Sequence, residues 1–359
     1  MKYLILIGCF VCSISGYSQY TAIPDPNFEN YLEQNGMGDG VPNNGRVLTS
    51  NINSVTNLGI SMLGISDLTG IEDFIALEGL GCADNQLVTL DLSANINLAS
   101  LNLNSNNLTN LILPPSNDLY IIYCDENFLT ELDISQNPNL EELSCVWNLL
   151  TGLDITQNPN LGYLFCGHNE IEGYFDTTQN PSLVFFSAYN NNITEVDFTQ
   201  NPVLNTFGGF SNPLENVDVR NGNNAIMQTF DVTDSNGLKC ILVDDASASY
   251  LDDWLKDPGT TFVNNQAECD ALGVAASTLQ DFTMYPNPAI STVAINLPNQ
   301  GVDGLIVTVT NNLGQVLESK EPLENTTVIK LDVSGYAAGV YFVTLKTGNG
   351  IATKKLVVH

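Results

Sequence analysis

The sequence predicts a repeat solenoid of mainly β character followed by a small all-β, Ig-like sandwich. Apolar residues begin similar units every 21 or 22 positions through the middle of the chain, and an asparagine lies five positions after nearly every start. Beyond residue 280, longer alternating β patterns replace these asparagine-rich units. A fixed period indicates stacked structural units, whereas alternation over longer runs is typical of antiparallel strands.

The first 18 residues predict a secretory signal peptide. Lys2 supplies a positive start, residues 4–11 are apolar, and small residues at 16–18 offer a cleavage position before Gln19. The apolar run is too short to span a bilayer, which needs roughly 20 residues, and no later run reaches that length. We therefore expect no transmembrane segment, and a mature protein that is secreted or held at the outer cell surface.

The charge balance argues against nucleic acid as a partner. Ten Lys and Arg residues stand against forty Asp and Glu residues, for a formal charge of −30. A phosphate backbone or an anionic membrane would be repelled over most of this surface.

The repeat units are aligned on their first apolar residue. These starts are Leu58, Leu80, Leu101, Ile122, Leu143, Leu164, Phe186 and Phe207. The asparagines that follow are Asn85, Asn106, Asn127, Asn148, Asn169, Asn191 and Asn212. An inward asparagine at a turn can bond to backbone amides and carbonyls of its own and neighbouring coils, so we interpret the row as a structural ladder.

Cysteines recur two positions after four of these starts, as Cys82, Cys124, Cys145 and Cys166. Other units place Leu103 or Ala188 at the same position. We therefore interpret these thiols as small apolar fillers, with metal or redox chemistry as the less favoured alternative. No metal site and no cofactor are expected.

These units resemble the leucine-rich repeats of exported Bacteroidetes proteins, which are related in design to internalin-type arrays. The resemblance covers residues 58–243 and implies a leucine-rich-repeat solenoid with an irregular or short helical convex side. Residues 19–57 resemble its N-terminal cap with a short helix, for which Asp25 and Pro26 suit the first positions. Such a cap seals the end of the core.

Residues 244–272 are expected to cap the other end of the solenoid. Cys240 and Cys269 lie outside the repeat register and could form a disulfide in an oxidising compartment. Loop-closure entropy would credit this bridge with about 3 kcal/mol. The alternative is two separately buried thiols.

After a linker at residues 273–280, residues 281–359 resemble the type A sorting domain of the type IX secretion system. Three ordered motifs carry this resemblance, around residues 285–288, 312–317 and 339–358, and the middle one reads Asn-Leu-Gly-Gln-Val-Leu. The motif residues are Tyr285, Pro286, Asn287, Pro288, Gly339, Tyr341 and Lys355. The resemblance implies export by that machinery, which would be a partner of the chain.

The sequence contains few residues whose pattern indicates catalysis. His168 and the terminal His359 are the only histidines, and His168 sits at a repeated position beside a ladder asparagine. A row of carboxylates recurs once per coil at Asp91, Asp133, Asp154, Asp197 and Asp218. We interpret the row as turn residues accepting backbone amides, with weak divalent-cation binding as the second possibility. We predict that the chain is not an enzyme and has no catalytic residue.

A ligand-binding face is predicted where aromatic and acidic residues flank the inward positions of neighbouring coils. Its residues are Tyr123, Asp125, Glu126, Trp147, Tyr163, Phe165, His168, Tyr189 and Phe210, with Glu142 among them. Clustered aromatics on the concave side of a solenoid favour binding of a protein or glycan, although packing within the repeat would also explain them. A spacer without a ligand and an accessory module of glycan processing are the alternatives, and we expect a monomer.

Overall fold

The computed structural model describes residues 19–272, 282–297, 304–322, 327–347 and 350–359. The predicted signal peptide and linker lie outside these ranges. The chain divides between Asn265 and Gln266 into two compact units, and each is described by itself.

The solenoid begins with a cap of one short hairpin-like pair and two helices. Strand β1 (Tyr20–Ala22) pairs antiparallel with β2 (Arg46–Leu48), and α1 (Pro26–Gln34) and α2 (Thr49–Ile52) complete it. The Asp25 carboxylate accepts the amides of Asn27 and Phe28, which confirms it as the N-cap of α1. Its second oxygen accepts the Ser66 amide at 2.8 Å. One carboxylate thus joins the cap helix to the first repeat.

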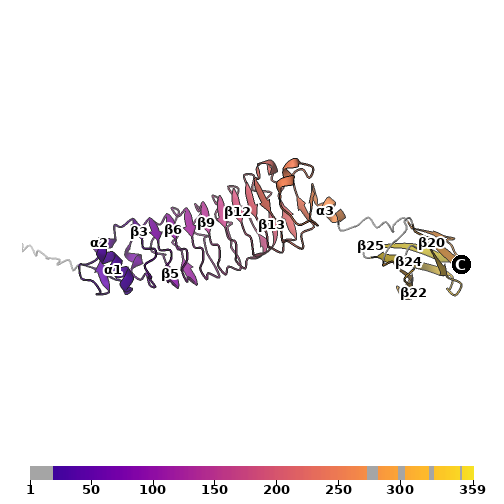
Figure 1. The fold of residues 1–359 in the computed structure, drawn as a ribbon, viewed down its shortest axis with the longest axis horizontal. Coiled ribbons are helices and arrows are strands. Elements are labelled where there is room, and N and C mark those ends of the chain that lie inside the picture. The colour runs from indigo at the N-terminus through magenta and orange to yellow at the C-terminus, as the bar shows by residue number, and fades with distance from the viewer. Residues whose placement is uncertain (1–18, 273–281, 298–303, 323–326, 348–349) are drawn as a thin grey trace, which may run out of the picture. The chain divides into compact units, whose positions relative to one another are not determined.

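A parallel sheet of nine three-residue strands forms one side of the solenoid (Figure 1). Its strands are β3 (Asn57–Gly59), β4 (Gly79–Gly81), β6 (Ser100–Asn102), β8 (Ile121–Tyr123), β9 (Glu142–Ser144), β10 (Tyr163–Phe165), β12 (Phe185–Ser187), β14 (Thr206–Gly208) and β16 (Thr229–Asp231). Each predicted start occupies the middle of its strand, so that Leu143 pairs with Leu164. We call the outer side of this sheet the main face.

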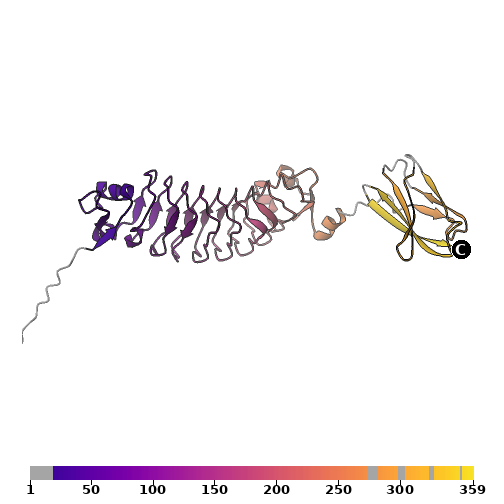
Figure 2. The same cartoon turned by 90° about the horizontal axis from the view of Figure 1, so that it is seen from below.

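The opposite side carries two further parallel sheets, joined to the first by turns (Figure 2). These strands are β5 (Thr89–Asp91) with β7 (Asn110–Ile112), and β11 (Glu172–Phe175), β13 (Asn192–Asp197), β15 (Asn216–Asp218), β17 (Cys240–Leu242) and β18 (Thr261–Val263). Between β7 and β11 the coils through residues 131–133 and 152–154 are irregular. The 3-10 turns η1 (Ile71–Asp73) and η2 (Asn224–Ile226) supply the short helical elements.

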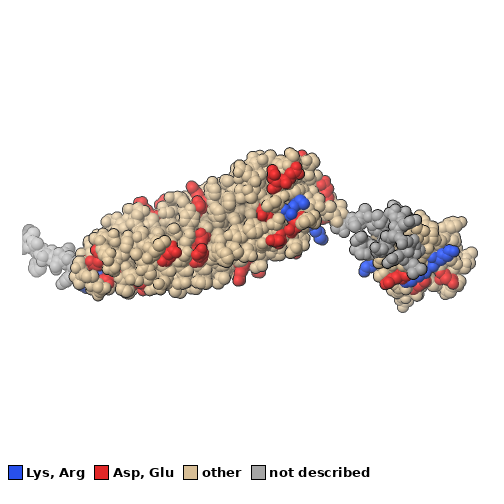
Figure 3. All heavy atoms as spheres, in the orientation of Figure 1, with Lys and Arg blue, Asp and Glu red and all other residues tan. Residues whose placement is uncertain are grey.

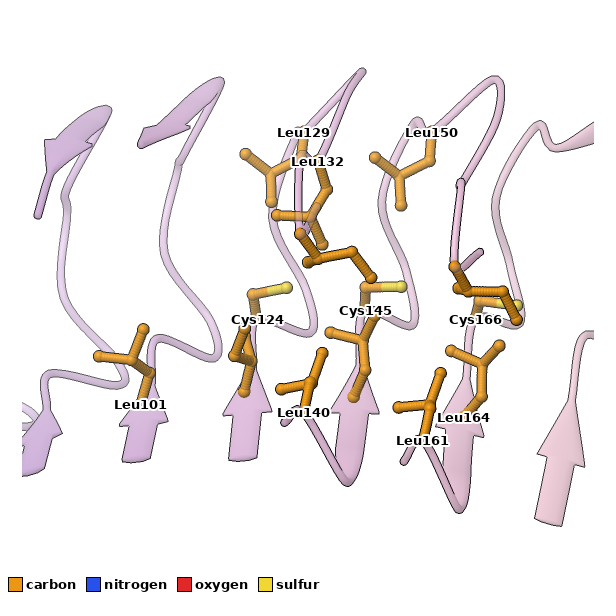
Figure 4. Packing of buried hydrophobic residues seen from close by; sticks show 14 of the residues in the cluster. Leu101, Cys124, Leu129, Leu132, Leu140, Cys145, Leu150, Leu161, Leu164 and Cys166 are labelled. Carbon is orange, nitrogen blue, oxygen red and sulfur yellow. The ribbon is translucent and has the colours of Figure 1, made fainter. Parts of the chain in front are cut away.

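Apolar side chains from successive coils stack in columns and fill the interior of the solenoid (Figure 4). Cys124, Cys145 and Cys166 point inward between leucines of the two sides, and their side chains are free thiols, as is Cys82. Burial raises the pKa of the Cys82 thiol to about 12. Because the thiolate is the reactive form, these cysteines serve as inert fillers.

The solenoid ends in a cap that extends both sides. Trp254 stacks on Phe230 with ring centroids 4.4 Å apart, after the turn η3 (Ser249–Asp253). Strand β18 adds to β17 in parallel. Cys240 and Cys269, the latter in α3 (Gln266–Leu272), are disulfide-bonded, as the sequence predicted.

The C-terminal unit contains two antiparallel sheets around one core. One sheet holds β19 (Thr283–Tyr285), β20 (Thr292–Asn296) and β23 (Val328–Asp332), and the other β22 (Val316–Lys320), β21 (Ile306–Asn311), β24 (Gly339–Thr347) and β25 (Gly350–Val358). Buried aliphatics of both sheets form a single cluster. This arrangement confirms the predicted small all-β sandwich. Within the described ranges, no helix combines the length and apolar character that crossing a bilayer requires.

Candidate functional site

The seven predicted ladder asparagines connect each coil to the one before it. Asn148 is representative: its Oδ1 accepts the Leu129 amide at 3.0 Å. Its Nδ2 donates to the carbonyls of Cys124 and Cys145, at 3.0 and 3.1 Å. All seven asparagines are buried. The amide therefore satisfies backbone groups that a buried turn would otherwise leave unpaired.

A second asparagine column, which the sequence analysis did not identify as a ladder, lies at the other turn of the coils. Its members are Asn95, Asn137, Asn158, Asn180 and Asn201, all buried. Asn158 Nδ2 donates to the carbonyls of Ile134 and Asn137. The Asn-Pro pairs at four of these positions are the signal that would have revealed it. The main-sheet strand of each coil therefore lies between a residue of the second asparagine column and a ladder asparagine.

The residue before each ladder asparagine has a left-handed backbone conformation. Nine residues with φ between 53° and 62° form this column: Met62, Asp84, Ser105, Glu126, Trp147, His168, Asn190, Ser211 and Asp234. Their amides bond to the next coil, as Trp147 N does to Gly167 O at 3.1 Å. Bulky residues rarely adopt this conformation, which costs of order 1–3 kcal/mol. The fold therefore holds Trp147 and His168 in a backbone conformation that is strained for side chains of their size.

Aromatic rings stack in a row formed by this column and by the position just before it. The Trp147 and His168 rings are nearly parallel, with centroids 3.6 Å apart, and Tyr189 meets the His168 ring edge-on at 5.0 Å. Tyr189 in turn stacks on Phe210 at 4.9 Å. Trp147 remains 55% exposed. One continuous aromatic row therefore runs across four coils with its first ring open to solvent.

A second aromatic group lies on the strands themselves. Phe165 packs against Phe185 with centroids 4.8 Å apart, and Tyr163 is 46% exposed. Phe185 was not among the predicted residues, although it occupies the same position in its unit as Tyr163 does in the preceding one. Aligning the residue before each unit start would have identified it.

The predicted acidic residues gather on the N-terminal side of Trp147. Asp125 accepts the Val146 amide at 2.8 Å and the Ser144 hydroxyl at 2.5 Å. Burial is the largest cause that raises the pKa of Asp125, and the nearby Glu126 carboxylate adds to it. On the adjoining strand Glu142 accepts the Tyr123 hydroxyl at 2.8 Å, which raises the pKa of that phenol. The carboxylates here have neutral hydrogen-bond partners.

The aspartate row on the opposite side has the turn role that the sequence suggested. Asp133 and Asp154 each accept the backbone amide two residues later, at 2.9 Å. These bonds, from Ser135 and Thr156, lower the pKa of both carboxyls. In the part of the chain that is described, no group of three metal-ligating side chains comes together.

His168 is arranged as a stacking residue and not beside a nucleophile. Its ring is stacked on Trp147, and Nδ1 lies 2.5 Å from the Asn190 side-chain nitrogen. The buried thiol of Cys166 belongs to the interior, on the other side of the sheet. The ring of His168 is therefore covered on one face by Trp147 and approached at Nδ1 by Asn190.

The first and last sorting motifs meet at one edge of the C-terminal sandwich. Asn287 donates to the Lys355 carbonyl at 2.8 Å and accepts the Val357 amide at 2.9 Å. Tyr341 donates to the Ala337 carbonyl at 2.7 Å. The side chain of Asn287 thus links the first motif to the last by hydrogen bonds, the first of them to a residue 68 positions later in the chain.

Comparison with known proteins identifies this second unit. Residues 283–359 match the family of secretion system C-terminal sorting domains. A search of curated proteins returned no match.

Solved structures similar to the chain include repeat proteins of two bacterial genera. The functional domain of InlJ from Listeria monocytogenes, described as including a cysteine ladder, is 20% identical with a TM-score of 0.36, covering 95% of this chain and 99% of its own. The internalin inlF of the same species is 17% identical with a TM-score of 0.46, over 69% and 86% of the two chains. YopM from Yersinia enterocolitica is 24% identical with a TM-score of 0.40, over 53% and 37%.

The assignment of the solenoid rests on the strand register and the asparagine bonds of the chain itself. The family match of residues 283–359 adds the identity of the C-terminal unit. The chain is a secreted or cell-surface protein that consists of a leucine-rich-repeat solenoid and a type IX secretion C-terminal sorting domain.

Proposed function

We propose that the chain is a non-catalytic binding protein, exported by the type IX secretion machinery, whose main face recognises a protein or glycan ligand. The observation that carries the proposal is the stacked row Trp147, His168, Tyr189 and Phe210. Aromatic side chains contribute large contact areas at little entropic cost, which is why they are enriched in binding surfaces. Here they are also held in place by the backbone of successive coils.

Strain supports the same conclusion. The left-handed position of Trp147 would be occupied at lower cost by Asn, Asp or Gly, as it is by Asp84 and Asn190 in other coils. A bulky, half-exposed aromatic at such a position adds nothing to the core. Strained residues of this kind cluster at functional sites.

The test is a triple variant in which Trp147, Phe165 and Tyr189 become serine, in the full-length chain. A matched control replaces Phe128 and Tyr174, which are 50% and 48% exposed and lie away from the main sheet. All proteins are applied to arrays of glycans and of extracellular proteins after circular dichroism has verified folding.

We expect selective ligands that the control retains and the triple variant loses. Retention by a folded triple variant, or silence of the wild-type chain on both arrays, would contradict the proposal and favour a spacer role.

A further inference from the structure

The solenoid is depleted of positive charge to an unusual degree. No Lys or Arg occurs between Arg46 and Arg220. The same stretch contains 21 acidic residues, at positions 67, 72, 73, 78, 84, 91, 118, 125, 126, 131, 133, 141, 142, 154, 170, 172, 176, 195, 197, 215 and 218. In Figure 3 red atoms are spread along the solenoid, and blue atoms on it appear mainly towards its C-terminal end. A partner of this surface has to be neutral or cationic.

The ring of Trp147 has one covered face and one open side. His168 covers the first face at 3.6 Å. On the other side the next residue of the left-handed column is Glu126. Its carboxylate accepts the hydroxyl of Ser105, one further coil away, at 3.0 Å. Glu126 is therefore drawn towards the preceding coil and leaves the ring of Trp147 uncovered, in agreement with an exposed fraction of 55%.

Three carboxylates lie on this coil and the coil before it: Asp125 accepts the Val146 amide, directly before Trp147, and Glu126 precedes Trp147 in the left-handed column. Asp125 and Glu126 are consecutive, and Glu142 lies on the adjoining strand β9. Among the residues that the structure describes, no ion pair joins a Lys or Arg to any of these three carboxylates; the pairs nearest in the solenoid sequence are Arg46–Asp39 and Arg220–Asp218. The repulsion between the carboxylates of Asp125 and Glu126 is therefore not offset by a positively charged side chain. A cation from outside would relieve it.

We propose that this acidic–aromatic patch, consisting of Tyr123, Asp125, Glu126, Glu142, Trp147 and His168, seats an arginine side chain of a protein partner. The inference rests on the proposed function and specifies its ligand. A guanidinium stacks on the open face of Trp147 while its N–H groups reach the bordering carboxylates. Arginine suits this seat better than lysine because its planar cation can stack on an indole and bond to a carboxylate in a fork at the same time.

The seat is tested with the full-length chain and the blocked pentapeptide Gly-Arg-Gly-Arg-Gly. Versions with lysine or citrulline in place of arginine keep the length, and citrulline keeps the shape while removing the charge. Binding is followed by calorimetry and by tryptophan fluorescence, to which the exposed Trp147 responds more than Trp254, which is 5% exposed.

We expect the arginine peptide to bind about tenfold more tightly than the citrulline peptide, a difference of about 1.4 kcal/mol. The double variant Asp125→Asn with Glu126→Gln should lose a similar factor, as should Trp147→Leu. The matched control Asp133→Asn with Asp154→Asn removes the same charge from the opposite side and should stay within about twofold, because charges more than about 10 Å away are screened at ordinary salt.

Equal losses in the control and patch variants would overturn the inference, since the binding would then be a general effect of negative charge. So would equal binding of arginine and citrulline peptides, which would indicate a neutral ligand. If the array ligands still depend on Trp147, Phe165 and Tyr189 while the peptide fails, the inference is wrong and the proposed function stands. Failure of both overturns both.

Discussion

Removing one ladder asparagine in the middle of the solenoid should be among the most destabilising single changes in the chain. In Asn148→Ala the buried amide of Leu129 loses its acceptor, which costs about 1–3 kcal/mol. The carbonyls of Cys124 and Cys145 each lose one donor but keep a bond from a neighbouring ladder asparagine, for about 0.5–1.5 kcal/mol each. We therefore expect the free energy of unfolding to fall by about 2–6 kcal/mol.

Urea unfolding followed by circular dichroism measures this loss. The control is Asn160→Ala, which removes an exposed asparagine whose side chain bonds to the Asn139 side chain at 3.1 Å. An exposed bond of this kind is replaced by water, so the control should change the unfolding free energy by no more than about 0.5 kcal/mol. Similar midpoints for the two variants, with equal urea slopes, would refute the view that the ladder stabilises the fold through buried backbone groups.

Three further changes probe other parts of the solenoid. Thr177→Val keeps the shape of the side chain but removes a hydroxyl that lies 2.7 Å from both Asn201 Oδ1 and the Asp197 carbonyl and donates its single proton to one of them at a time. Urea unfolding should show a loss of about 1–3 kcal/mol, and an unchanged midpoint would count against the second column as a stabilising element. Burial raises the pKa of Asp125, so the folded state holds its proton more tightly than the unfolded chain and gains stability as pH falls through the raised pKa towards about 4. Asp125→Asn should accordingly raise the Tm at neutral pH and flatten its pH dependence, whereas a lower Tm would contradict the assigned cause. Replacing Cys240 and Cys269 with serine should lower the free energy of unfolding by about 3 kcal/mol. A reductant should destabilise the wild-type chain and leave the variant unchanged. A wild-type chain whose stability does not respond to reductant would disprove the contribution of the disulfide.

Much of the fold follows from the period of the sequence. Because each unit start is the central residue of a three-residue strand, the alignment that placed Leu143 over Leu164 also gave the register of the main sheet. The inward cysteines followed from the same alignment. The sandwich was predictable because alternation over five or more residues, as at 292–297, is strong even in isolation.

The conformation of the displayed residues could not be predicted in the same way. Trp147, His168 and Glu126 share no chemistry, and neither Trp nor Glu favours a left-handed backbone. That backbone is imposed by the amide bond each makes to the next coil, a tertiary effect that no local propensity reports. For this reason the sequence located an aromatic face but not the stacking of Trp147 on His168, nor the open ring beside Glu126.

The binding residues named from sequence stay a prediction until a ligand is found. Their neighbourhood is nevertheless informative, because the structure joins Tyr123 and Glu142 across the adjoining strands β8 and β9 and bonds Asp125 to the Val146 amide, directly before Trp147. The sequence could not supply this arrangement in detail, since side chains two to six positions before a ladder asparagine point in directions set by the coil and not by their own chemistry.

The reach of the ladder bonds has a consequence for how such a chain changes in evolution. Each ladder amide contacts its own coil and the coil before it, as Asn148 does with Cys145 and Cys124. A duplicated coil would therefore find the same donors and acceptors on both of its sides, and deletion of a coil would rejoin two surfaces that already match. The number of coils, and with it the area offered to a ligand, can grow or shrink by whole units without any new core having to be invented.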